Sequence, residues 1–201
     1  MKANFKKLAI ASLLSVVLPA QSVLACTAIT LNAEDGSTIQ ARTQEWGAFD
    51  LRSQVMKVSQ DVEFTGTTPD GQQGFQWEAK YGAVGINAVD LPVFIDGVNE
   101  EGLTVAVLYM PGFAQFQDYD ATQASNTIAA TDLPMWMLTT QNSIDDIKTE
   151  LPKLNVVDVK IPSFGNISPP IHFLVTDSEG KTVVIEYTNG KLDIYDNEVG
   201  V

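Results

Sequence analysis

The sequence predicts an α+β protein that contains an antiparallel β-sheet. Strand-like runs separated by turn residues come first, helical patterns are confined to the middle of the chain, and strands return near the end. No change in composition marks a linker and no internal repeat occurs, so residues 26–201 are expected to belong to one domain.

The first expected element is a β-hairpin formed by residues 26–31 and 38–42, with a turn at Asp35-Gly36-Ser37. The segment 96–102 has the residues of a turn and is expected to be a loop. Four further strands, predicted from runs of β-branched and aromatic residues, lie at 54–58, 75–80, 83–88 and 103–109.

Helices are expected at 132–140 and after Ser143, because Ser143 and Asp146 resemble a capping box. Two hairpins then close the chain. Their strands are expected at 171–176, 183–187 and 192–195.

Residues 1–25 have the three zones of a secretory signal peptide. A basic start up to Lys7 is followed by an apolar stretch at Leu8–Ala20 and by the ending Val23-Leu24-Ala25. The apolar stretch is shorter than the roughly 20 residues that a membrane span needs. We therefore expect a soluble protein, periplasmic or secreted, whose mature chain begins at Cys26.

The mature chain is strongly acidic. Lys2, Lys6 and Lys7 precede Cys26 and no acidic residue does, so 12 less 3 leaves 9 basic side chains against 25 acidic ones, a net charge of −16. Such a surface repels phosphate backbones and anionic lipid, which argues against nucleic acid and membrane surfaces as partners.

Cys26 is the only cysteine and cannot form an internal disulfide. Removal of residues 1–25 would give this residue a free α-amine as well as its thiol. A thiol has a reference pKa of about 8.5 and an α-amine one of about 7.7 to 8.0, so the amine can accept the proton of the thiol. The sequence therefore predicts a nucleophile that carries its own base.

Two charged residues follow at the end of the second predicted strand, which the hairpin returns alongside Cys26. The guanidinium of Arg42 would favour a thiolate, and the carboxylate of Glu45 would orient the amine. In an arbitrary protein such charges are often surface residues and a lone cysteine is often a small buried hydrophobe. The coincidence with a cleavage site favours the functional interpretation.

Five segments occur in a specific order and spacing from Cys26 onward. They are Cys-Thr-Ala-Ile-Thr at 26–30, Ala-Arg-Thr-Gln-Glu-Trp at 41–46, Asp-Gly-Val-Asn-Glu-Glu-Gly-Leu at 96–103, Pro-Ile-His-Phe at 170–173 and Val-Ile-Glu-Tyr at 184–187. In this order the chain resembles the choloylglycine hydrolases, the group of penicillin V acylases and bile salt hydrolases. The resemblance implies an N-terminal nucleophile hydrolase with an αββα fold that acts on linear amides other than peptides.

The resemblance also assigns roles. Cys26 matches the nucleophile, Arg42 the arginine beside it, and Glu45 an acidic residue that is usually Asp and is Glu in members from Gram-negative bacteria. Tyr109 falls where the family places a side chain of the oxyanion hole, although a strand-end tyrosine at the margin of a sheet is the alternative. The family pattern continues beyond Tyr195-Asp196-Asn197, so the resemblance implies a truncated chain, an incomplete αββα sandwich and low activity in isolation.

Four side chains flank these positions and could form the wall of an apolar acyl pocket, or belong to the core. They are Trp46, Phe49, Met110 and Phe113. His172 lies between apolar neighbours and is interpreted as structural. One His and one Cys argue against a structural zinc site, and no phosphate-binding or dinucleotide-binding glycine pattern occurs, so no metal and no cofactor are implied.

The expected substrate is a small amide, and penicillin V, a conjugated bile salt and an N-acyl homoserine lactone all remain open. A homo-oligomer of the full-length form is open too. Two alternatives stand beside the enzyme. Val23-Leu24-Ala25-Cys26 approximates a lipobox, in which Cys26 would anchor a lipid-linked binding protein. The chain could also be an inactive truncated homologue.

Overall fold

The computed structural model describes residues 26–45 and 50–198, and its centre is a seven-stranded antiparallel sheet. The strand order across the sheet is β13-β12-β11-β8-β7-β6-β3. These strands are β3 (Val55–Val58), β6 (Ala83–Ile86), β7 (Asp96–Asn99), β8 (Thr104–Tyr109), β11 (Ile171–Thr176), β12 (Thr182–Thr188) and β13 (Lys191–Asp196). The predicted signal peptide and the residues Trp46 and Phe49 lie outside the described residues.

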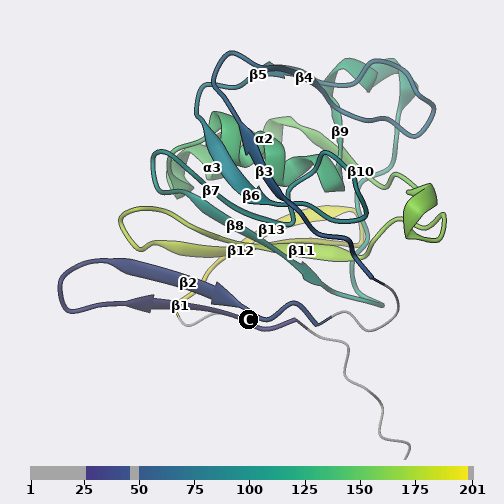
Figure 1. The fold of residues 1–201 in the computed structure, drawn as a ribbon. Coiled ribbons are helices and arrows are strands. Elements are labelled where there is room, and N and C mark those ends of the chain that lie inside the picture. Colours follow the sequence, from purple (N-terminus) through teal and green to yellow (C-terminus); the bar gives the residue numbers. More distant parts are fainter. Residues whose placement is uncertain (1–25, 46–49, 199–201) are drawn as a thin grey trace, which may run out of the picture.

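Helices cover one face of this sheet (Figure 1). The α-helices are α2 (Leu133–Thr140) and α3 (Ile144–Glu150), and short 3₁₀ turns are η1 (Ala121–Asn126), η2 (Ala130–Asp132), η3 (Leu151–Lys153) and η4 (Pro162–Phe164). Two small sheets complete the helical side: β4 (Glu63–Thr65) pairs antiparallel with β5 (Gln76–Glu78), and β9 (Thr127–Ala129) pairs parallel with β10 (Asn155–Val157).

The main core lies between the helices and the large sheet. All residues of α2 are buried, and its side chains Leu133, Met137 and Leu138 pack with Phe94 and Phe173 from the region of the sheet. Residues 133–138 of α2 are all apolar, and the hydroxyl groups of Thr139 and Thr140 at its end donate to the carbonyls of Met135 and Trp136, so no polar stripe is left to face water.

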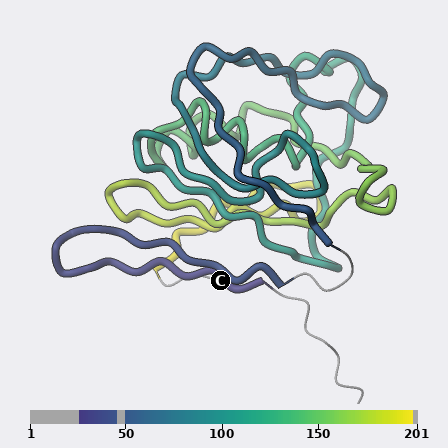
Figure 2. Tube along the Cα trace, viewed as in Figure 1, coloured from purple at the N-terminus to yellow at the C-terminus, as the bar shows by residue number. Residues whose placement is uncertain are grey.

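The hairpin of β1 (Ala28–Asn32) and β2 (Thr38–Arg42) crosses the opposite face of the large sheet as a separate layer (Figures 1 and 2). Its contact with the sheet is small and largely polar. Ala28 packs on a small cluster with Leu108 and Leu174, and the hydroxyl groups of Thr30 and Thr176 lie 3.1 Å apart. The described residues therefore form helix, sheet and strand layers in that order.

The outward face of the hairpin is apolar. Ile29, Leu31 and Ile39 are 40%, 54% and 55% exposed, while the alternate residues of both strands face the large sheet. The usual strand pattern, apolar toward the sheet and polar toward water, is thus reversed here.

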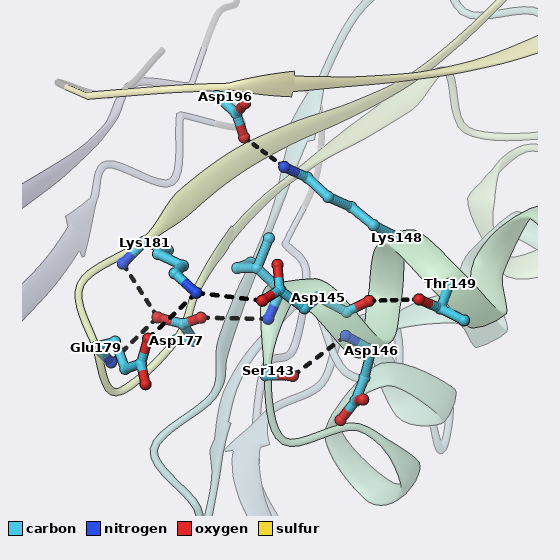
Figure 3. A network of polar contacts seen from close by, with 10 residues as sticks. Ser143, Asp145, Asp146, Lys148, Thr149, Asp177, Glu179, Lys181 and Asp196 are labelled. Carbon is cyan, nitrogen blue, oxygen red and sulfur yellow. Dashed lines mark hydrogen bonds and ion pairs between the residues drawn. The ribbon is translucent and has the colours of Figure 1, made fainter.

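A network of polar contacts ties α3 to the turn between β11 and β12 (Figure 3). The carboxylate of Asp177 is buried and accepts hydrogen bonds from the backbone N–H groups of Ile144 at 3.2 Å, Glu179 at 3.1 Å and Lys181 at 3.0 Å. At the exposed rim, Lys148 Nζ lies 2.6 Å from Asp196 Oδ1.

The predicted hairpin at the start and both predicted helices are confirmed. Ser143 caps α3 as expected, since its Oγ accepts from the N–H of Asp146 at 3.2 Å. The expected loop at 96–102 is wrong for its first half: residues 96–99 form β7, because they pair with β6 on one side and β8 on the other, and only the last three residues turn. The three-residue strands β4, β9 and β10 were not predicted, since so short a run has no usable periodicity.

Candidate active site

A cavity with a mostly apolar wall opens beside the end of β8, and Cys26 and Arg42 both line it. Three stretches of chain supply most of the apolar wall: 88–95, 107–109 and 161–171. Gln44 and Thr131 are the other polar residues that reach it, apart from Tyr109. The arrangement therefore places the predicted nucleophile and the predicted arginine at one apolar site.

The position of Cys26 is fixed by the hairpin. Next to it, Thr27 extends the pairing beyond β1, because its N–H donates to Thr43 Oγ1 at 3.1 Å and its carbonyl accepts from the N–H of Thr43 at 2.8 Å. Cys26 is half-buried and packs against the small cluster on the large sheet. The thiol thus lies at the junction between the hairpin and the sheet.

Arg42 ends β2 in register with Ala28 and reaches down to the large sheet. Its Nη1 lies 3.1 Å from Asp96 Oδ2, its Nη2 donates to the carbonyl of Val107, and its side chain is 11% exposed. Its Nε has no hydrogen-bond partner among the described residues. A buried ion pair of this kind holds the guanidinium in one orientation, with its charge beside the cavity.

Burial raises the pKa of the Asp96 carboxyl to about 6, although its attraction to Arg42 and their hydrogen bond act to lower it. Near neutral pH the carboxylate is mostly ionised and balances the guanidinium. On acidification through pH 6 it becomes protonated, and the positive charge of Arg42 is then left without its counter-charge.

The other predicted site residues are placed as follows. Tyr109, the last residue of β8, is partly buried and lines the cavity. Glu45 is exposed beyond the end of β2, and neither it nor Met110 is among the residues that line the cavity. Phe113 is 74% exposed. The roles of these three residues stay predictions, as do those of Trp46 and Phe49 outside the described residues.

Two parts of the site were missed by sequence reasoning. The sequence predicts a turn at Asp96, because a strand of only four residues shows too little alternation to indicate a side chain directed at the hairpin. The segment 88–95, Ala-Val-Asp-Leu-Pro-Val-Phe-Ile, supplies much of the cavity wall. Its almost continuous apolar character outside a helix was the available signal.

Within residues 26–45 and 50–198, no group of three or more His, Cys, Asp or Glu side chains is close enough to hold a metal ion. In the same part of the chain, no helix is long and apolar enough to cross a membrane.

A helix layer, a large antiparallel sheet and a second strand layer that carries Cys26 at its edge correspond to an incomplete αββα sandwich, the fold class of the N-terminal nucleophile hydrolases. Within this class, residues 26–201 match the family model of linear amide C–N hydrolases, choloylglycine hydrolase family. The chain belongs to the choloylglycine hydrolase family.

The relatives include a bile salt hydrolase/transferase of Clostridium perfringens, 27% identical over 88% of this chain and 52% of that protein. A penicillin V acylase of Pectobacterium atrosepticum is 26% identical over 92% of this chain and 50% of that protein. The chain thus spans about half the length of the curated relatives it matches.

Solved structures agree on the fold. A variant of conjugated bile acid hydrolase from Clostridium perfringens superposes with a TM-score of 0.68 at 25% identity, over 86% of this chain and 51% of that one. Penicillin V acylase from Agrobacterium tumefaciens gives 0.73 at 22% identity, over 86% of this chain and 50% of that one.

Proposed function

We propose that the protein hydrolyses a linear carbon–nitrogen amide bond, with the Cys26 thiolate as nucleophile after removal of residues 1–25. The observation that carries the proposal is that Cys26 and Arg42 line the same apolar cavity in a member of a family of linear amide hydrolases. The removal of residues 1–25 belongs to the proposal, together with export to the periplasm or the medium.

The proposed reaction needs only the groups of the chain and water. The α-amine of Cys26 takes the proton of the thiol, and the sulfur attacks the amide carbonyl to form a tetrahedral oxyanion. Backbone N–H groups and the hydroxyl of Tyr109 stabilise this oxyanion. The protonated amine gives its proton to the leaving nitrogen, and the C–N bond breaks to leave a thioester. Water, deprotonated by the same amine, then releases the acid.

Arg42 contributes through its charge. The guanidinium lies beside the cavity and favours the thiolate over the thiol, by an amount that depends on the ionisation of Asp96. In this proposal the carboxylate of Glu45 helps to orient the amine by a charge-assisted hydrogen bond.

The cavity supports a substrate with an apolar acyl group. Leu91, Phe94 and Ile171 are typical of its wall, and a wall of this kind favours burial of an aliphatic or aromatic body while leaving a polar leaving group outside. Penicillin V, a conjugated bile salt and an N-acyl homoserine lactone all satisfy this description, and they are the substrates to assay.

The test is hydrolysis of these three amides by the exported protein and its variants. Replacement of the nucleophile in Cys26→Ala should lower turnover at least about 1000-fold, since only binding and oxyanion stabilisation remain. Ser37→Ala, in the turn at the far end of the same hairpin, should keep full activity. Because the relatives are about twice as long, the assay includes the protein with its natural continuation after Val201, where its gene has one.

Two results would overturn the proposal. Full activity in Cys26→Ser would exclude the sulfur as nucleophile. An intact mass several hundred daltons above that of residues 26–201 would indicate a lipid on Cys26, as the lipoprotein alternative requires.

A further inference from the structure

The hairpin lies on the large sheet with β1 in step with β11, and this register has a consequence for Cys26. Ala28 packs in one cluster with Leu174, and two residues further Thr30 lies 3.1 Å from Thr176, oxygen to oxygen. At the next step, a Cβ on Gly180, in the turn after β11, would meet Asn32 Oδ1 at 2.8 Å. The two strands therefore advance together along the same direction.

Extended backward by two residues, the same register would bring Cys26 to the level of His172 on β11. Residues 26, 28 and 30 share one face of the hairpin, and residues 172, 174 and 176 share the facing side of the sheet, because side chains alternate along a strand. Cys26 packs against the cluster that contains Leu108, and Leu108 is the register partner of His172 on β8. His172 and Cys26 are therefore expected to face each other between the hairpin and the large sheet.

His172 is held by a carboxylate. Its Nδ1 lies 3.2 Å from Glu186 Oε1 on β12, and the side chains are 13% and 25% exposed. An ionised carboxylate can only accept, so Nδ1 carries a proton and Nε2 of the neutral ring is left as an acceptor. An acceptor fixed in this way, beside an amine with N–H donors, is suited to orient that amine.

We propose that His172, oriented by Glu186, is a positioning residue for the α-amine of Cys26. Nε2 accepts a hydrogen bond from an amine N–H, which turns the nitrogen lone pair toward the sulfur. The imidazole keeps its proton count throughout, and the only proton that moves is the one that passes from sulfur to the amine. This inference rests on the proposed function, since the amine exists only after residues 1–25 are removed.

The charged groups around this position come from several elements. Glu186 on β12 faces Asp193 on β13 in register, and on the other side of Cys26 stand Arg42 of β2 and Asp96 of β7. The facing residue of β8, Leu108, is uncharged. Among these groups, His172 is the one that can offer a ring nitrogen as a hydrogen-bond acceptor toward Cys26.

The test follows alkylation of Cys26 by iodoacetamide as a function of pH, read by intact mass. Since Cys26 is the only cysteine, every adduct reports this sulfur. Asn and Gln replace His with different geometry: Asn retains an amide near Nδ1 and loses the acceptor at Nε2, whereas Gln retains an amide oxygen near Nε2. The comparison uses exported protein that begins at Cys26 and cytoplasmic protein that keeps residues 1–25, in which the nitrogen is an amide.

In exported protein, His172→Asn should raise the pH of half-maximal alkylation by about one unit and slow alkylation at pH 7 several-fold, since the amine is no longer aimed at the thiol. His172→Gln should restore most of the wild-type rate, and Glu186→Gln should lie between. In protein that keeps residues 1–25, all four should alkylate alike. Thr176→Val, which removes a polar contact of the same layer away from Cys26, should leave the profile unchanged.

An unchanged profile in exported His172→Asn would overturn the inference, and so would an equal shift in the two forms, which would indicate a structural role alone. A blocked nitrogen on exported Cys26 would overturn it as well. Alkylation needs no substrate, so the two proposals can fail separately. If His172→Asn shifts the pH profile of alkylation as expected but the protein hydrolyses none of the amides, the proposed function is contradicted and the positioning role is supported.

Discussion

The ion pair of Arg42 and Asp96 is the most consequential contact between residues of the two sheets. It joins β2 to β7 across 54 residues of sequence, and it brings a carboxyl with a raised pKa against the arginine that lines the cavity with Cys26. The protein keeps this carboxyl ionised near neutral pH at a cost in desolvation. Protonation of the carboxyl removes this desolvation cost, so the free energy of unfolding depends on pH through Asp96.

Asp96→Asn should remove this dependence. The folded-state pKa of about 6 lies above the ordinary value of 3.8, so the folded protein binds the proton more tightly than the unfolded chain. The contribution of the carboxyl to stability is therefore complete below about pH 4 and is lost as the pH rises through 6. Urea unfolding from pH 4 to pH 7 should show the stability of the wild type falling relative to Asp96→Asn, by at most about 3 kcal/mol.

Asp35→Asn is the control for this prediction. Asp35 is exposed in the hairpin turn, and hydrogen bonds from Ser37 lower its pKa, so its difference curve should change in the opposite direction or stay flat. A difference between wild type and Asp96→Asn that is constant from pH 4 to pH 7 would contradict the prediction.

The turn between β7 and β8 depends on the side-chain amide of Asn99. Asn99 is buried; its Nδ2 donates to the carbonyls of Leu138 at 3.0 Å and Gln141 at 2.8 Å, and its Oδ1 accepts from the N–H groups of Glu101 and Leu103. One amide therefore ties the end of α2 to the turn. Only Asn combines both roles at this length, since Asp cannot donate.

Asn99→Ala should destabilise the protein by about 3 kcal/mol, because buried carbonyl and N–H groups lose their partners. Asn99→Asp should cost more, since a carboxylate would face two carbonyl oxygens. Denaturant unfolding measures both. Asn126→Ala, which removes one exposed bond to the carbonyl of Lys153, should cost less than about 1 kcal/mol. An Asn99→Asp variant as stable as the wild type would refute this account of the turn.

At the scale of the whole molecule, hydrogen bonds and ion pairs join the helix layer to the large sheet. Asp177 is the main one on the helical side, with three backbone donors from two elements, whereas Lys148–Asp196 lies at the rim (Figure 3). Buried and exposed links of the same network should differ in their contribution to stability, because solvent screens the exposed pair.

Asp177→Ala should lower the free energy of unfolding by about 2 to 4 kcal/mol, since the buried N–H of Ile144 and the part-buried N–H groups of Glu179 and Lys181 lose their acceptor. Lys148→Ala should change it by less than about 1 kcal/mol. Thermal and urea unfolding of the two variants give the comparison, and equal effects would show that burial does not govern this network.

The parts of the molecule that could be predicted are those specified by neighbouring residues. Cys26 and Arg42 lie at the same end of the hairpin because a local turn joins the two strands that carry them, and Ser143 caps α3 through a contact three residues away. The ion pair with Asp96 could not be predicted from the residues themselves, since it depends on how two layers stack. The orientation of the hairpin, with its apolar face outward, could not be predicted for the same reason. Alternation identifies the two faces of a strand pair but does not indicate which face packs on the sheet.

The hairpin contacts the large sheet through Ala28, Cys26 and polar pairs such as Arg42–Asp96, whereas the seven-stranded sheet is buried against α2 by many apolar side chains. Local unfolding has the lowest free energy where few apolar contacts must be broken. We therefore expect the hairpin to detach from the large sheet as one cooperative unit before the rest of the molecule unfolds. The Cys26 thiol thus lies on the layer with the fewest apolar contacts to the large sheet, and the free energy of local opening of this layer, rather than that of global unfolding, governs how long the candidate site stays assembled.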